Sequence, residues 1–158
     1  MRRESAVTPQ PPLSLKGRAL RLLGAREYSR AELERKLASF EDEPGSLVQA
    51  LDDLQAKGFI NEQRVVESVL HRRSAKLGAT RIRQELLGKG LAPEAVISAV
   101  EQLRATEVDR AREVWRKKFG QLPTDAAQRG KQMRFLASRG FGGDTIHKVV
   151  SGGFDVED

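Results

Sequence analysis

The chain has 158 residues and a formal net charge of +6; 39% of its residues are hydrophobic, 32% are charged and only 5% are aromatic. This composition argues against one thick hydrophobic core and favours a thin, elongated helical protein. The absence of cysteine excludes disulfides and thiolate metal sites, and no apolar run is long enough to span a membrane.

The two ends of the chain are predicted to be tails. Residues 1–13 contain three prolines and show no hydrophobic periodicity, so we expect a disordered N-terminal tail. The two arginines after Met1 are not followed by the apolar stretch that an export signal requires. Residues 152–158 form an acidic C-terminal tail that contains Asp155, Glu157 and Asp158.

Residues 14–60 are predicted to form three helices. Apolar residues recur at helical spacing from Leu15 onwards. Ser29 and Glu32 have the spacing of a capping box, which predicts the start of a second helix. The acidic loop 41–45 separates this helix from the third, and we prefer that interpretation to a cation site. The second helix is expected to bury Leu33, Leu37 and Phe40. The apolar residues expected on the first and third helices are Leu15, Ala19, Leu22, Leu23, Leu47, Val48, Leu51 and Leu54.

One phrase occurs three times and predicts a repeated helical unit. It reads Leu-x-x-(Lys/Arg)-Gly followed by an apolar residue, which is Phe59, Leu91 or Phe141. A basic last turn, a glycine that can take positive φ and an apolar residue that folds back are typical of a helix C-terminus. The unit starts are about 45 residues apart, a spacing in the range of helical repeats. Three tandem three-helix units are therefore predicted, at 14–60, 61–105 and 106–151.

The second and third units are predicted to repeat the helix order of the first. Asn61 is the expected N-cap of the helix that opens the second unit, and Gly78 is its expected end. Trp115 lies on an apolar stripe with Val108, Ala111 and Phe119, so we expect it in the core rather than stacked on a base. The sequence thus predicts an all-α fold in an elongated, curved array. The helices of these two units are expected at roughly 62–75, 79–89, 93–103, 107–119, 124–138 and 144–151.

No motif in the sequence points to catalysis, a cofactor or a metal site. The glycines around Gly90 and Gly140 resemble parts of a phosphate-binding loop, but no strand precedes them and the pattern is incomplete. Gly140 also lies in an Arg-Gly-Phe-Gly-Gly run that resembles an RNA-binding segment. Both stretches are better explained as helix ends. The two histidines have no cysteine or second histidine nearby. Asp52 and Asp53 are adjacent in sequence and so cannot face each other as a catalytic pair. We therefore expect a non-enzymatic protein that needs no cofactor.

The middle of the chain carries the most specific pattern. Its members are Gly58, Ile60, Arg73, Lys76, Gly78, Arg81, Ile82, Glu85, Leu86, Lys89 and Gly90. With these residues the chain resembles the RecX family of bacterial recombinase regulators, whose signature is a glycine and an isoleucine before an Asp-Asp pair, an arginine-rich helix, and then Lys…Gly…Arg-Ile-x-x-Glu-Leu-x-x-Lys-Gly. Asn61-Glu62 stands in place of the Asp-Asp pair and Val65-Val66 in place of the common Phe-Ala. These changes keep a capping side chain and apolar burial.

The resemblance implies a partner and a role. It implies a cytoplasmic, monomeric regulator of recombination, DNA repair and the SOS response, whose partner is the RecA recombinase filament on single-stranded DNA. Members of the family are thought to lie in the filament groove and to hinder ATP hydrolysis and strand exchange. Whether such a protein also contacts single-stranded or duplex DNA stays open at this point.

The positive charge that could contact such a partner is concentrated in the second and third units. Residues 13–61 carry eight basic and eight acidic groups, residues 62–105 carry eight and five, and residues 106–151 carry ten and five. Clustering of this kind favours an acidic or polyanionic partner. The candidate contact residues are Arg72, Arg73, Lys76, Arg81, Arg83, Lys89, Arg116, Lys117, Lys118, Arg129, Lys131 and Arg134.

A stand-alone DNA-binding protein is the alternative function. A three-helix unit with an arginine-rich helix also resembles a DNA-reading helix-turn-helix. However, tandem units without an evident recognition helix suit contacts to a nucleic-acid backbone or a protein surface better than base readout. Binding to naked DNA alone would favour this alternative.

Overall fold

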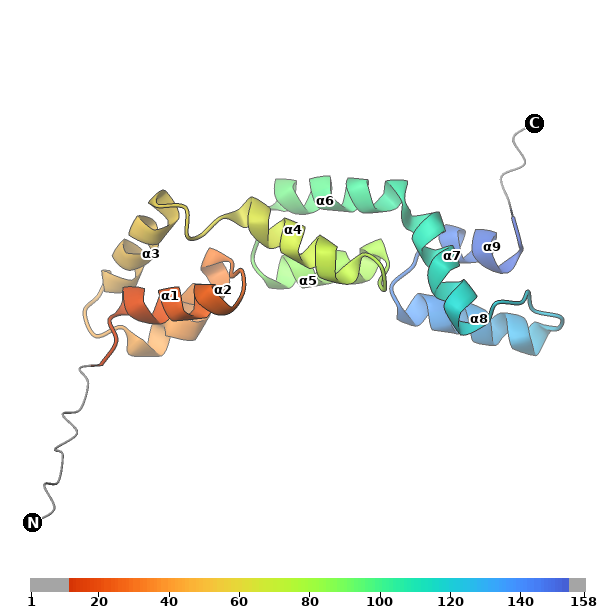
Figure 1. The fold of residues 1–158 in the computed structure, drawn as a ribbon, viewed down its shortest axis with the longest axis horizontal. Coiled ribbons are helices and arrows are strands. Elements are labelled where there is room, and N and C mark those ends of the chain that lie inside the picture. The colour runs from red at the N-terminus through yellow and green to blue at the C-terminus, as the bar shows by residue number, and fades with distance from the viewer. Residues whose placement is uncertain (1–11, 154–158) are drawn as a thin grey trace, which may run out of the picture.

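The computed structural model describes residues 12–153, and every regular element in that range is a helix. Figure 1 shows three groups of helices strung along the long axis, so the expected elongated, all-α array is confirmed. The two predicted tails lie almost entirely outside the described residues. The elements are α1 (Leu15–Ala25), α2 (Arg30–Leu37), the short 3-10 helix η1 (Ala38–Phe40), α3 (Ser46–Ala56), α4 (Glu62–Arg73), α5 (Ala79–Gly88), α6 (Pro93–Ala105), α7 (Glu107–Lys118), α8 (Ala126–Ser138) and α9 (Gly143–Val150).

Each group of three helices encloses a small hydrophobic core of its own. In the first unit, Leu33 of α2 and Leu51 of α3 are completely buried. Ile82 and Leu86 of α5 are completely buried in the second, and so is Leu136 of α8 in the third. Small separate cores of this kind fit a chain with few aromatic residues, because each unit needs only short aliphatic side chains to fill it.

The expected helix starts are confirmed by their capping hydrogen bonds. The Ser29 side chain accepts from the Glu32 N–H, and the Glu32 side chain accepts in return from the Ser29 N–H, which completes the capping box. Asn61 Oδ1 accepts from the Arg64 N–H at 3.0 Å. Such caps satisfy amide groups that the first turn of a helix leaves without partners.

The three repeated phrases do end helices, as predicted. Their glycines all have positive φ, and at the first copy the Phe59 N–H donates to the Leu54 carbonyl at 2.9 Å, as in a Schellman motif. The apolar residue packs back against its unit in only two of the copies. Leu91 and Phe141 are buried, whereas Phe59 is 47% exposed. The φ angles are 82°, 68° and 86° at Gly58, Gly90 and Gly140.

The prediction that Gly78 ends α4 was wrong. That helix ends at Arg73, and Gly78 is instead the N-cap of α5. The Arg110 guanidinium donates to the carbonyls of Ser74 and Leu77, both at 2.7 Å, and so fixes the loop that joins α4 to α5.

Two aromatic residues differ from their expected environments. Phe40 was expected in the first core, but it is 47% exposed and lies under the Arg18 guanidinium, whose carbon is 3.9 Å from the ring centre. The reason is local: α2 gives way to η1 before Phe40, which breaks the helical spacing from Leu37. Trp115 does pack against the third core, but it is only partly buried, and its indole N–H donates to Gln132 Oε1 at 2.8 Å.

The middle helices of the three units meet end to end. Ser29 at the start of α2 donates its hydroxyl to the Lys89 carbonyl at the end of α5. In the same way, the Gly78 N–H at the start of α5 donates to the Arg139 carbonyl at the end of α8, at 2.8 Å. Each junction brings a helix N-terminus to a helix C-terminus, which is the favourable arrangement of two helix dipoles. No helix among the described residues has the length and apolar character needed to cross a membrane.

Candidate polyanion-binding site

Four of the predicted contact residues are paired with carboxylates on their own units. Arg72 and Arg73 of α4 lie 4.0 Å and 3.4 Å from the Glu85 carboxylate of α5. On α7, Arg116 lies 2.7 Å from the carboxylate of Glu113. Lys117 is 3.9 Å from that same Glu113 carboxylate. All of these cations remain at least partly exposed, but their charges are partly neutralised before any partner binds.

Two further candidates belong to the junctions between units. Arg81 Nη1 donates to the Ser138 carbonyl at 2.8 Å, across the junction of α5 and α8. The Lys89 side chain is only 12% exposed, and its ammonium lies 3.3 Å from the Glu32 carboxylate across the junction of α5 and α2. Both residues hold the array together, and we leave them out of the proposed site.

The other candidates lie on separate faces. Arg83 of α5 lines a hollow beside α6 and α9. Arg129 of α8 lies with Nη2 3.3 Å from His147 Nδ1 of α9. Lys131 is exposed beside the loop between α7 and α8, and Arg134 covers Gly130 on α8. The structure therefore does not gather all the predicted cations on one surface.

One cleft gathers four cations where the second and third units meet. It is an open hollow of about 410 Å³, and Lys76, Lys117, Lys118 and Arg139 line it. Lys76 comes from the loop between α4 and α5, the two other lysines from the end of α7, and the arginine from the end of α8. Among residues 12–153, no carboxylate pairs with Lys76, Lys118 or Arg139. We call this hollow the basic cleft.

Phe135 of α8 supplies an aromatic wall of the basic cleft. Lys118 Nζ lies 5.6 Å from the centre of its ring and the Arg139 guanidinium carbon 5.1 Å, within cation–π range. Phe119 packs edge-on against the same ring at 5.4 Å between centres. The ring therefore attracts both cations.

Arg110 fixes the loop that carries Lys76. Besides the two loop carbonyls, its guanidinium donates to the Leu103 carbonyl at 2.9 Å, so one side chain ties α7 to the loop and to α6. Burial lowers the pKa of Arg110, and the nearby Glu107 carboxylate opposes that shift. An arginine begins so far above neutral pH that the guanidinium keeps its charge.

Glu107 holds the third unit against the second. The residue is only 9% exposed, and its carboxylate accepts from the Ala79 N–H at 2.9 Å and from the Thr145 hydroxyl at 3.0 Å. It thus caps the first turn of α5 and binds the start of α9 simultaneously. The basic cleft therefore lies at a junction fixed by directional hydrogen bonds.

The chemistry of the basic cleft suits anion binding. Ammonium and guanidinium groups bind phosphate or carboxylate oxygens, and an aromatic wall can contact the face of a base or an apolar side chain. The described residues contain no group of three or more His, Cys, Asp or Glu side chains placed to hold a metal ion. The arrangement can bind and position a polyanion.

Sequence reasoning missed two residues of the basic cleft. Arg139 was interpreted only as the basic residue of a helix end. It occupies the position of Lys57 and Lys89 in the repeated phrase, so the sequence did contain a signal for a cation there. Phe135 carried no signal, because its role depends on the contact between α7 and α8. Only the folded third unit brings these two residues to Lys76.

Comparisons with known proteins identify relatives along nearly the whole chain. Residues 105–150 match a family model described as RecX, third three-helix domain. The regulatory protein RecX of Leptothrix cholodnii is 54% identical over 89% of this chain and 90% of that protein. The protein of the same name from Ralstonia nicotianae is 42% identical over 91% of each.

A solved structure shares the fold. The crystal structure of RecX from Lactobacillus salivarius matches with a TM-score of 0.74, over 87% of this chain and 93% of that chain. The two sequences are 19% identical, so this likeness supports the architecture alone.

Proposed function

The chain belongs to the RecX family of regulatory proteins, and we propose that it binds the RecA recombinase filament on single-stranded DNA and inhibits its ATP hydrolysis and strand exchange. Membership confirms the resemblance first seen in the stretch from Gly58 to Gly90. In this proposal the protein is a cytoplasmic, non-enzymatic regulator that acts by occupying a surface.

The basic cleft is the observation that carries the proposal. Lys76, Lys118 and Arg139 converge there without carboxylate partners among the described residues, so their charge is available to a partner. A recombinase filament on DNA offers both phosphates and protein carboxylates, and either can satisfy such a cluster. The other exposed cations of the second and third units would add long-range attraction.

The shape of the array supports an extended partner. The three units lie in a row (Figure 1), so a long surface is available without any helix rearranging. The junctions at Glu107 and Lys89 hold neighbouring units by polar contacts. A row of fixed units can contact several repeats of a filament at once, and linked contacts strengthen binding beyond that of any single one.

The alternative, a stand-alone helix-turn-helix DNA-binding protein, is less compatible with the charges. The third helix of each unit would occupy the place of a recognition helix, and each carries an exposed or partly exposed carboxylate. These are Asp52 and Asp53 on α3, Glu94 and Glu101 on α6, and Asp144 on α9. Asp52 is paired with Arg30, and Asp53 with Lys16 and Lys57, but among the described residues the acids of α6 and α9 have no such partner. Carboxylates on a helix that enters a groove would weaken its attraction to the DNA phosphates.

The experiment is a pull-down with purified RecA recombinase, with and without single-stranded DNA and a non-hydrolysable ATP analogue. We expect retention of the parent protein on the assembled filament. The double variant Lys76→Glu/Lys118→Glu should lose most of that retention, because it reverses two charges of the basic cleft. Retention on naked DNA only, with none on the filament, would support the alternative function instead.

A matched control separates the basic cleft from charge in general. Arg21→Glu/Lys36→Glu changes the net charge by the same amount on the first unit, and both positions are exposed. This variant should bind the filament nearly as well as the parent. Equal losses from the two double variants would show that overall charge, and not the basic cleft, controls binding.

A further inference from the structure

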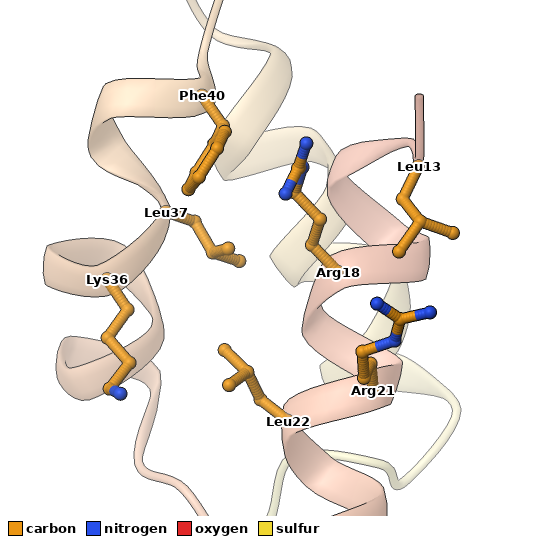
Figure 2. A pocket seen from close by; sticks show the side chains of 7 residues that line it. All are labelled: Leu13, Arg18, Arg21, Leu22, Lys36, Leu37 and Phe40. Carbon is orange, nitrogen blue, oxygen red and sulfur yellow. The ribbon is translucent and has the colours of Figure 1, made fainter. Parts of the chain in front are cut away.

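A second hollow lies on the first unit, far from the basic cleft. It is about 310 Å³ in volume and runs between α1 and the α2–η1 segment, where Leu22 and Leu37 form its floor (Figure 2). Leu13 and Phe40 stand at one end, 41% and 47% exposed. Large apolar side chains left open to solvent in one hollow are typical of a surface that another chain covers. We call this hollow the unit 1 groove.

Three cations surround the apolar floor of the unit 1 groove. They are Arg18 and Arg21 of α1 and Lys36 of α2, and Figure 2 shows all three beside it. Arg18 stacks on the Phe40 ring and Lys36 Nζ lies 5.8 Å from the Tyr28 ring centre, but no carboxylate pairs with any of the three among residues 12–153. The occupant should therefore combine negative charge with at least one apolar side chain.

The sequence itself contains a segment of that composition. Residues 154–158 read Phe-Asp-Val-Glu-Asp and lie outside the described part of the structure. In an extended peptide successive side chains point to opposite faces, so Phe154 and Val156 would face the same way, with Asp155 and Glu157 on the other side. We propose that the unit 1 groove of one copy binds residues 154–158 of a second copy, with the two apolar side chains on the floor and the carboxylates toward the cations.

The N-terminal segment next to the unit 1 groove is a poorer match. Residues 1–11 carry Arg2 and Arg3 against the single acid Glu4, so they would add positive charge to a hollow that already holds three cations. They also lack an aromatic residue. Charge complementarity thus selects the C-terminal segment over the N-terminal one.

The segment must come from another copy. Figure 1 shows α1 and α9 in the two outer groups of helices, with the middle group between them. Gly152 lies against the Leu122 side chain, just before the start of α8, and α8 and α5, which meet end to end, separate this point from the first unit. These two helices have 13 and 10 residues, about 35 Å in total at about 1.5 Å per residue. Five extended residues reach at most about 18 Å. The proposed contact therefore joins copies head to tail, in place of the monomer that we expected from the sequence, and it does not rest on the proposed function.

The first test uses a synthetic peptide of residues 152–158 with a fluorophore on its N-terminus. Its anisotropy should rise and saturate as full-length protein is added, more strongly at low salt. The variant Arg21→Glu/Lys36→Glu should bind the peptide at least about tenfold more weakly, because two attractive contacts become repulsive. A peptide with Phe154→Ala and Val156→Ala should also bind more weakly, since it keeps the charges and loses the apolar anchors.

The second test asks whether whole molecules associate. In sedimentation velocity the full chain should sediment faster as its concentration rises, whereas a chain ending at residue 153 and the Arg21→Glu/Lys36→Glu variant should each remain monomeric. A mixture of these two proteins should form a one-to-one complex, because one retains the unit 1 groove and the other retains the segment. That complementation is specific to head-to-tail contact.

Three outcomes would overturn the proposal. The first is peptide binding that the groove variant leaves unchanged. The second is a full chain that stays monomeric at high concentration and low salt, which would assign the unit 1 groove to an acidic segment of another protein. The third is an Arg21→Glu/Lys36→Glu variant that still binds the peptide but no longer binds a single-stranded oligonucleotide. That result would assign the unit 1 groove to nucleic acid.

Discussion

Gly78 and Gly140 lie backbone against backbone where the second and third units meet. A Cβ added to Gly78 would come within 2.3 Å of the Gly140 carbonyl oxygen, and one added to Gly140 within 2.3 Å of Arg81 Cβ. The Gly78 N–H donates to the Arg139 carbonyl in this contact. The absence of two side chains therefore allows the end-to-end approach of α5 and α8 that brings Arg139 to the basic cleft.

Gly78→Ala should destabilise the protein by about 1–3 kcal/mol or more, because the methyl group would meet backbone atoms that cannot turn aside. Urea unfolding measures the change. Gly24→Ala is the matched control: nothing lies within 4 Å of a Cβ at that position in α1, and alanine favours a helix by about 0.5–1 kcal/mol over glycine. If Gly78→Ala unfolded like the parent, the close contact between the two backbones would not exist in solution.

Glu107→Ala should cost about 2–4 kcal/mol, because it leaves the Ala79 N–H without an acceptor and removes the carboxylate beside Arg110. The measurement is the free energy of unfolding from urea titrations. Glu107→Gln keeps an acceptor oxygen of the same shape and should lose less than half as much. Equal losses from the two variants would mean that negative charge, rather than the hydrogen bonds to Ala79 and Thr145, holds this junction.

Trp115→Phe should cost about 0.5–1.5 kcal/mol, the net value of the hydrogen bond from the indole N–H to Gln132. Trp115→Ala should cost about 3 kcal/mol, toward the low end for a large aromatic side chain, because the ring is only partly buried. Thermal unfolding of both variants checks the order. A folded, fully stable Trp115→Ala variant that had lost partner binding would instead assign the ring to an interface.

The junction between the first two units should weaken in acid through Glu32. Burial raises the pKa of Glu32, but hydrogen bonds from Arg26 and from the Ser29 N–H, with the charge of Lys89, lower it overall below its ordinary 4.5. The unfolded chain therefore takes up a proton first as the pH falls. The stabilisation is present above pH 4.5 and is lost as the pH drops through the folded-state pKa.

Glu32→Gln should consequently lose less stability between pH 5 and pH 3 than the parent does. Urea unfolding at several pH values in that window gives the comparison, and Glu101→Gln on the exposed face of α6 is the control. Parallel pH profiles for the parent and Glu32→Gln would show that other carboxyl groups dominate acid unfolding.

Much of the fold was readable from local signals. The capping residues Ser29 and Asn61 and the Lys-Gly helix ends act within a single turn of helix, so the sequence predicts them without reference to the tertiary structure. Gly78 was misassigned for the opposite reason. Its role is set by Gly140, which is distant in sequence, and a lone glycine cannot reveal whether it permits a turn or a close backbone approach.

The candidate site was harder to predict because charge composition does not specify pairing. Arg72 and Arg73 appeared free in sequence, but Glu85 lies opposite them on α5, one helix further along the chain. Lys89 likewise pairs with Glu32 of another unit. Composition locates the excess of positive charge only to the second and third units. Which cations stay available depends on the contacts between helices.

Salt dependence should show what the basic cleft contacts. A cation that neutralises a DNA phosphate releases a counterion, so log affinity falls with log salt by about 0.7 for each phosphate contact on single-stranded DNA. A contact with protein carboxylates is screened by salt without that release and gives a shallower line.

If the basic cleft contacts phosphate, Lys76→Glu/Lys118→Glu should weaken filament binding and also reduce the slope by about one to two. If it contacts acidic protein surface, the same variant should bind more weakly at low salt with a nearly unchanged slope. The measurement is filament affinity from 50 to 300 mM salt, with Arg21→Glu/Lys36→Glu as the control of equal charge. Parent-like affinity of the Lys76→Glu/Lys118→Glu variant at every salt concentration would place the filament contact elsewhere on the array.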